Sequence, residues 1–75
     1  MTSSDLDSMP RADYVAWCKQ RALTETEPAS MLASMVSDMR KRADTDGPHL
    51  GFLTVAGAAH ANDPAGMRHF IEGFA

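Results

Sequence analysis

The sequence predicts an all-α protein: a compact bundle of about four short helices joined by tight turns that contain proline or glycine. Apolar residues recur at helical spacing in the first half of the chain, and proline signals open the later segments. The one short apolar run has no second strand to pair with. Because 75 residues can bury only one core, we expect a polar lead-in at 1–8 and a single helical domain at 9–75.

The predicted core is thin, which favours self-association. Twelve of the hydrophobic residues are Ala and six are Met, and the single Cys excludes an internal disulfide. A small domain with so little apolar bulk usually needs an added support. We therefore expect a homo-oligomer.

The first helix is expected to begin with Ser8 as its N-cap and Pro10 in its first turn. At about 100° per residue, Tyr14, Trp17 and Arg21 fall on one side of this helix. On that aromatic side, the Arg21 guanidinium can stack on a ring or reach a buried carboxylate. A polar segment before the next proline ends the helix.

The second helix is expected to begin at Pro28 or Ala29. It should carry the basic run Arg40–Arg42 in its last turn, where cations suit the helix dipole. Asp38 and Arg42 would then form an i,i+4 pair with the acid first, which is the favourable order.

The same helix carries a stripe of methionines. Their spacing is that of a buried helix face, so core packing is the first interpretation. The alternative is a soft, adaptable surface that binds a partner helix. The stripe consists of Met31, Met35 and Met39.

The segment Pro48–Ala61 is apolar on all sides, which is typical of a central helix or of a helix at an oligomer seam. A strand over Gly51–Ala56 is the competing interpretation, but the Ala-rich continuation favours a helix. Gly51 and Gly57 are tolerable in a helix if they permit close approach of another backbone.

A fourth helix is expected from Pro64 to about Glu72, opened by the cap signal Asn62-Asp63. Gly73 is well placed as the C′ residue, which lets Phe74 fold back on the last turn. The residues expected to point inward are Met67, Phe70 and Ile71.

The sequence shows no catalytic or metal-binding set. His49, His60 and His69 lack the spacing of paired metal ligands, so we expect neither a metal nor another cofactor, and His69 is expected to contact Phe74. Cys18 lies in the apolar arc of the first helix, which indicates packing. Acidic pairs fall at turns, and no phosphate-binding glycine loop is present. We therefore expect no enzyme activity.

Aromatic and basic residues supply the candidate binding site. Rings beside an arginine make good hot spots for a protein partner, and they can also stack a base while a cation pairs with a phosphate. The alternative is that the rings belong to the core and that Arg21 pairs with Glu72 or Asp38. The candidate binding residues are Tyr14, Trp17, Lys19, Arg21 and Arg68.

Charge and hydropathy exclude two classes of partner. The formal net charge of −3 argues against general nucleic-acid binding. The longest apolar stretch, Leu50–Ala61, is too short to span a bilayer, and the acidic N-terminus lacks the apolar region of a secretory signal. We expect an intracellular protein that does not associate with membranes.

Three segments resemble a family of very small bacteriophage helical proteins that have no assigned function. Residues 14–23 match Y-x-x-W-x-K-x-R-A-L, residues 33–39 match A-S-M-x-S-D-[LM], and residues 68–74 match R-x-F-I-E-G-F, in that order. The joint between the first two segments is shorter than is usual in the family. The resemblance implies a phage origin and action in the host cytoplasm.

The expected function is that of a non-enzymatic phage accessory protein that binds and modulates a host factor, in host takeover or counter-defence. One alternative is an oligomeric sponge that sequesters a nucleotide-type immune signalling molecule. Another is a minor structural or assembly component of the virion. The expected partners are therefore a second copy of the chain and either a host protein or a small nucleotide-like ligand.

Overall fold

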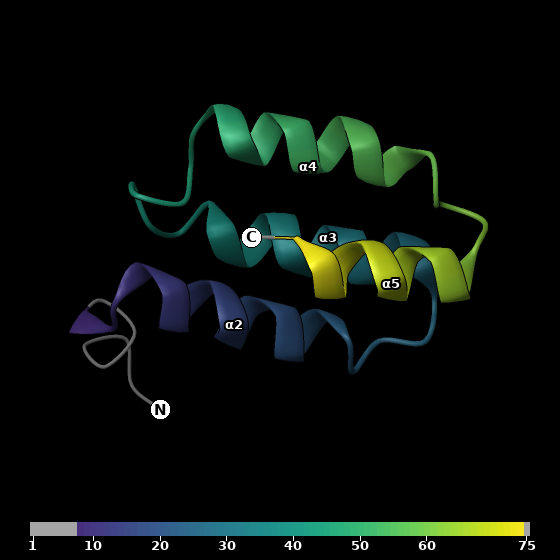
Figure 1. Cartoon of the computed structure of the whole chain (residues 1–75), viewed down its shortest axis with the longest axis horizontal. Helices are drawn as coiled ribbons and strands as arrows, with labels where there is room; N and C mark the ends of the chain where they lie inside the picture. Colours follow the sequence, from purple (N-terminus) through teal and green to yellow (C-terminus); the bar gives the residue numbers. More distant parts are fainter. Residues whose placement is uncertain (1–7, 75) are drawn as a thin grey trace.

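The computed structural model describes residues 8–74, and this part of the chain contains four helices and no strand. The predicted all-α class is thereby confirmed (Figure 1). The lead-in expected at 1–8 falls, except for its last residue, outside the described residues. The helices are α2 (Arg11–Ala22), α3 (Pro28–Met39), α4 (Pro48–Ala58) and α5 (Pro64–Gly73).

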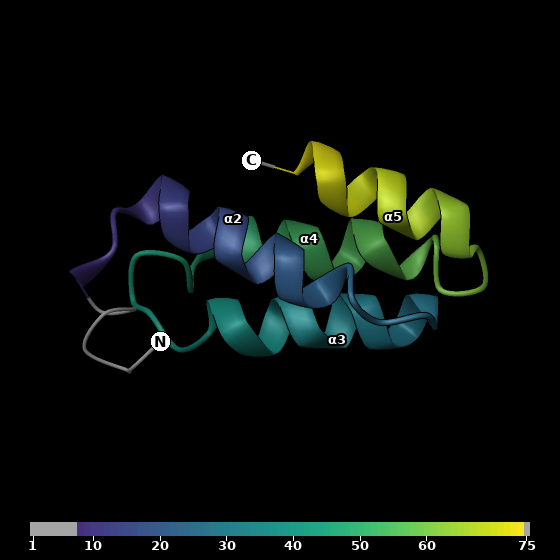
Figure 2. The same ribbon diagram turned by 90° about the horizontal axis from the view of Figure 1, so that it is seen from below.

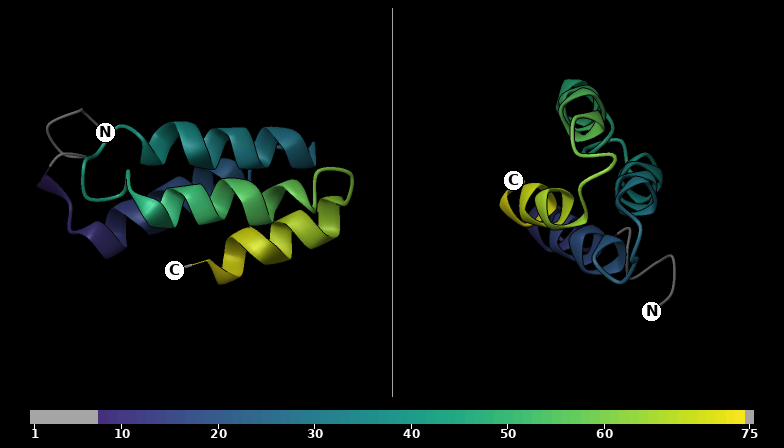
Figure 3. Two further views of the ribbon diagram at one scale, coloured as in Figure 1. Left: turned by 90° about the horizontal axis from the view of Figure 1, so that it is seen from above. Right: turned by 90° about the vertical axis from the view of Figure 1, so that its right-hand side faces the viewer.

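Helix α3 organises the bundle, because it packs against each of the other three helices. In the end-on view of Figure 3, α4 and α2 lie at opposite corners, with α3 and α5 between them on the two sides. Figure 2 shows α2 running alongside α3. Helix α4 packs mainly on α3. Of the two interpretations of this apolar segment, the central helix is therefore wrong, and the helix at an oligomer seam stays a prediction.

Helix α2 starts later than the sequence predicts. Pro10, not Ser8, is its N-cap, and the Pro10 carbonyl accepts the first helical hydrogen bond from the Tyr14 amide at 2.9 Å. The proline has φ −55° and ψ 150°, and this extended ψ separates it from the helix that follows. No side chain caps this end of α2.

Helix α3 ends earlier than predicted, at Met39, so the basic run lies beyond the helix and not in its last turn. The buried Thr45 hydroxyl lies 2.5 Å from the Met39 carbonyl oxygen and 3.2 Å from that of Arg42. The hydroxyl thus donates to main-chain carbonyls near the helix end, where carbonyls lack partners within the helix. The predicted pair between Asp38 and Arg42 is also wrong, because each finds a different partner.

Helix α4 confirms the choice of helix over strand at Gly51–Ala56, although it ends at Ala58. Its buried residues include Gly57, where an added Cβ would lie 2.6 Å from Leu32 Cδ1. The close neighbour at Gly57 is the Leu32 side chain, so the predicted close approach of another backbone is not what the structure shows. Gly51 has nothing within 4 Å of such a Cβ and faces open space.

Helix α5 has the predicted N-cap, since the Asp63 carboxylate accepts a hydrogen bond from the Gly66 amide at 3.0 Å. Its C-terminus differs from the prediction. Gly73 is the last helical residue and does not adopt a positive φ. Phe74 is extended and buried, and its ring contacts His49 at 4.8 Å between centroids, whereas His69 is exposed.

The core lies between the helices and confirms that the methionine stripe is internal. Met35 and Met39 are fully buried and Met31 is 2% exposed, so the alternative of a methionine binding surface is wrong. Phe70, expected inside, is only partly buried. The buried hydrophobic residues are Tyr14, Val15, Cys18, Ala22, Met31, Met35, Met39, Leu50, Leu53, Met67, Ile71 and Phe74.

Candidate interaction surface

Tyr14 belongs to the core and is not offered to a partner. It is 1% exposed, and its hydroxyl donates a hydrogen bond to the main-chain carbonyl of Asp38. Its ring stacks on that of Trp17 at 5.5 Å between centroids. The Arg42 guanidinium covers the ring at 4.7 Å. Tyr14 therefore ties α2 to the end of α3 and supports Trp17 from inside.

A buried carboxylate holds two exposed cations at the junction of α2 and α3. The Asp38 side chain is only 3% exposed. It accepts a hydrogen bond from Arg21 Nε at 2.8 Å and lies 3.4 Å from Lys41 Nζ. The side chains of Arg21 and Lys41 are 54% and 62% exposed. The alternative pairing of Arg21 with Asp38 is thus confirmed.

Trp17, Arg21 and Lys41 form a small surface that we call the Trp17 shelf. The Arg21 guanidinium carbon lies 4.8 Å from the centre of the Trp17 ring, which is a cation–π geometry. Arg21 uses Nε for the bond to Asp38. Within residues 8–74, its two terminal nitrogens donate no hydrogen bond. The shelf therefore combines a half-buried ring with a guanidinium that is fixed in place and still able to donate.

Lys19 and Arg68 lie on a different seam, between α2 and α5. Lys19 Nζ donates to the Glu72 carbonyl oxygen at 3.1 Å, and Arg68 Nη2 donates to the Leu23 carbonyl oxygen at 3.1 Å. Both bonds bring a cation to carbonyls near a helix C-terminus. These two cations therefore bond across the α2–α5 seam, whereas Arg21 bonds to Asp38 on α3.

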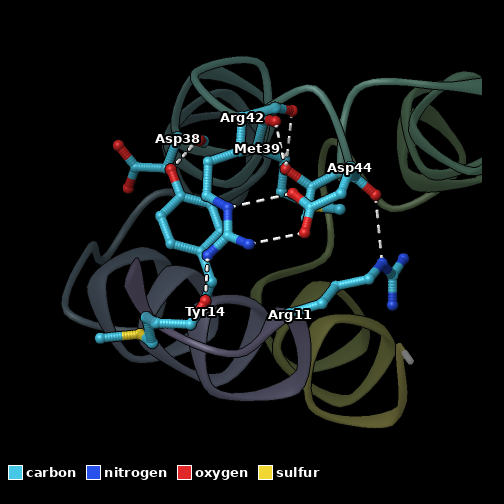
Figure 4. A network of polar contacts seen from close by, with 8 residues as sticks. Arg11, Tyr14, Asp38, Met39, Arg42 and Asp44 are labelled. Carbon is cyan, nitrogen blue, oxygen red and sulfur yellow. Dashed lines mark hydrogen bonds and ion pairs between the residues drawn. The ribbon is translucent and has the colours of Figure 1, made fainter. Parts of the chain in front are cut away.

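A further polar network, absent from the sequence-based set, joins the start of α2 to the loop after α3 (Figure 4). Arg42 donates to both carboxylate oxygens of Asp44, at 3.0 and 2.6 Å, and to the Met9 carbonyl oxygen at 2.6 Å. Arg11 Nε donates to the Asp44 carbonyl oxygen at 3.1 Å. The only signal in the sequence is Asp44, two residues after Arg42. Residues two apart do not face each other on a helix, so this pair is not expected when the basic run is assigned to a helix.

Burial makes Tyr14 and Cys18 weaker acids than they are in water. Cys18 is fully buried, and loss of solvation, with the negative charge of Asp38 adding to it, raises the pKa of the thiol to about 11. Loss of solvation also raises the pKa of Tyr14 to about 12, with further contributions from Cys18 and Asp38. Cys18 is therefore a packed thiol and not an activated nucleophile at neutral pH.

These two raised pKa values predict that the fold weakens in alkali. The folded state holds the Cys18 and Tyr14 protons more tightly than the unfolded chain does. The ordinary pKa values are 9.0 for the Cys18 thiol and 10.0 for the Tyr14 hydroxyl. The stabilisation is complete below about pH 9 and is lost as the pH rises through about 11 to 12. Melting temperatures measured from pH 7 to pH 11 should fall steadily above pH 9. The melting temperature of Cys18→Ala should fall less steeply with pH. Equal slopes for the two proteins would show that the Cys18 thiol does not contribute to the loss of stability in alkali.

Helix α4, the segment for which the sequence left a central position or an oligomer seam open, presents a second exposed surface. Phe52 is 62% exposed and Val55 is 77% exposed. A groove of about 410 Å³ lies on the α5 side of the helix, and another of about 520 Å³ lies on the α3 side. None of the five candidate binding residues lines either groove. The signal in the sequence was the all-round apolar character of this segment.

No group of three or more His, Cys, Asp or Glu side chains in residues 8–74 is placed to hold a metal ion. No helix in that range has both the length and the hydropathy needed to cross a bilayer.

Comparisons with protein-family models, with curated proteins and with solved structures found no match to this chain. They therefore add nothing to what the sequence resemblance and the two exposed surfaces support.

Proposed function

We propose that this chain is a non-enzymatic bacteriophage accessory protein that acts by binding a host protein in the host cytoplasm, with the Trp17 shelf as the contact site. One observation carries the choice of site. The exposed Arg21 guanidinium is held over the Trp17 ring by the buried Asp38 carboxylate. Trp and Arg are the residues most enriched in binding hot spots.

The anchoring of Arg21 lowers the cost of binding. A free arginine side chain loses rotamer freedom when a partner captures it, at about 0.5–1.5 kcal/mol. Here the Nε bond to Asp38 and the ring beneath already fix the side chain. The two terminal nitrogens can then donate to both oxygens of one carboxylate. A host protein that presents an exposed Asp or Glu beside an apolar residue fits this surface.

The shelf predicts a specific loss of host-protein capture. Immobilised protein should retain a host protein from lysate, and Trp17→Ala should lower its recovery at least tenfold, as expected for a hot-spot loss of about 1.4 kcal/mol or more. Arg21→Lys should also weaken capture, because lysine keeps the charge but cannot grip a carboxylate in two places. Recovery is measured by quantitative mass spectrometry.

Matched controls separate the shelf from the rest of the surface. Lys19→Ala and Arg68→Ala remove cations from the α2–α5 seam and should leave capture unchanged. Circular dichroism checks that each variant remains folded. Equal recovery by Trp17→Ala and the unaltered protein would remove the shelf as the contact site.

A further inference from the structure

The outward side of α4 carries no charged side chain. No Asp, Glu, Lys or Arg occurs in the sixteen residues from Gly47 to Asn62. Leu50, Leu53 and Gly57 face the core. The residues that face outward, which we call the α4 outer face, are Gly51, Phe52, Val55, Ala58 and Ala59, and all five are exposed.

The α4 outer face lies in an open position in the bundle. In the end-on view of Figure 3, α4 occupies one corner and its far side meets no other helix of the described chain. Phe52 borders the groove on the α5 side, and Thr54 borders the groove on the α3 side. We refer to the α4 outer face together with the grooves on its two sides as the strip.

We propose that this strip is the interface between two copies of the chain, with the two α4 helices antiparallel and Val55 on the twofold axis. A twofold interface places the same patch against itself. With Val55 on the axis, each Phe52 meets Ala58 of the other copy, and each Gly51 meets Ala59. The largest side chain of the face thus lies over a small one, and the small residues let the two helices approach closely.

Charge also favours a second copy as the occupant. Each chain carries a formal charge of −3, so two copies repel when charged surfaces meet. The α4 outer face itself brings no charged side chain into the contact, and Arg40 is the one charged residue among those that line the two grooves. The Trp17 shelf, on α2 and the segment after α3, lies outside the contact. A protein or nucleic-acid partner chosen by charge would find nothing on this face to pair with.

The size of the strip is that of a weak, reversible dimer and not of a permanent one. A standard interface takes about 20–30 residues from each partner. The α4 outer face and the residues that line the two grooves number seventeen. The strip is therefore just below standard size, and a dimer with a dissociation constant of about 1–100 µM is expected.

Sedimentation equilibrium of the whole chain tests the proposal. The protein should change from monomer to dimer across the micromolar range, and Val55→Asp should raise the dissociation constant at least tenfold by placing two like charges on the axis. Ala12→Asp, which adds the same charge to an exposed site on α2, should change it little. A monomer at all concentrations up to about 500 µM, or a dimer indifferent to Val55→Asp, would overturn the proposal.

A crosslinking measurement fixes the register and covers the case of a variant that fails to fold. In Val55→Cys, oxidised glutathione should join the two copies across the axis by taking up the two electrons that the thiols release. The native Cys18 is fully buried and does not compete. Ala12→Cys should give no crosslinked dimer. Equal crosslinking at the two positions would exclude the α4 pairing, and Trp17→Ala should dimerise normally because the two surfaces are separate.

Discussion

Met35→Ala is expected to lower the free energy of unfolding by about 2–5 kcal/mol. Met35 is fully buried on α3, the helix that packs against all the others, so the shortened side chain leaves a cavity at the centre of the core. A 75-residue domain has little stability to spare, and this loss removes much of it. Urea unfolding followed by circular dichroism measures the change as a shift in the midpoint.

The control lies on the same helix. Ser37 is exposed, and Ser37→Ala should change the free energy of unfolding by less than about 0.5 kcal/mol. A loss of under about 1 kcal/mol for Met35→Ala would mean that α3 does not hold the centre of the bundle.

Arg42→Met is expected to destabilise the fold by about 2 kcal/mol. Arg42 is the only residue of the basic run with a largely buried side chain, at 14% exposure. The substitution removes its bonds to Asp44 and to the Met9 carbonyl, and its cation–π contact with Tyr14. Met keeps most of the apolar stem, so the loss reports the polar contacts. Thermal unfolding should show a decrease of roughly 8–16 °C.

Two further variants define the Arg42 result. Arg40→Met removes an exposed neighbouring cation and should be nearly neutral. Arg42→Lys keeps the charge but cannot donate to both Asp44 oxygens, so its stability should lie between the other two. If Arg40→Met and Arg42→Met had equal effects, the network in Figure 4 would contribute nothing to stability.

Much of the fold could be predicted because proline marks the helix starts. Pro28, Pro48 and Pro64 each stand at the first position of a helix. The errors arose where the deciding contact is distant or ambiguous. Ser8 and Pro10 both offer a reasonable start, and only the hydrogen bond at the Pro10 carbonyl distinguishes them.

The end of α3 was missed for a related reason. An i,i+4 acid–base pair favours continuing the helix. The chain leaves the helix because the Thr45 hydroxyl turns back to the last carbonyls and Arg42 turns to Asp44. The spacing of residues along one helix predicts neither contact, because both involve residues beyond the end of that helix.

In the candidate site, the sequence predicted a contact correctly only where it suggested both residues of the pair. The pairing of Arg21 with Asp38 was one of two alternatives, and the structure selects it. Lys19 and Arg68 were grouped with Arg21 by residue type, yet they serve the α2–α5 seam. A helical wheel gives the face of a residue but not the helix that covers it. The all-round apolar pattern of α4 likewise left a central position and an oligomer seam open.

Amide hydrogen exchange of the whole chain at two concentrations, about 1 µM and about 500 µM, tests the central claim that α3 is the core helix and α4 the pairing helix. We expect α3 amides to exchange slowly at both concentrations, whereas α4 amides should exchange faster in the dilute sample and become protected in the concentrated one. Helix α4 protected as strongly as α3 in the dilute sample, or equally unprotected in both samples, would contradict it.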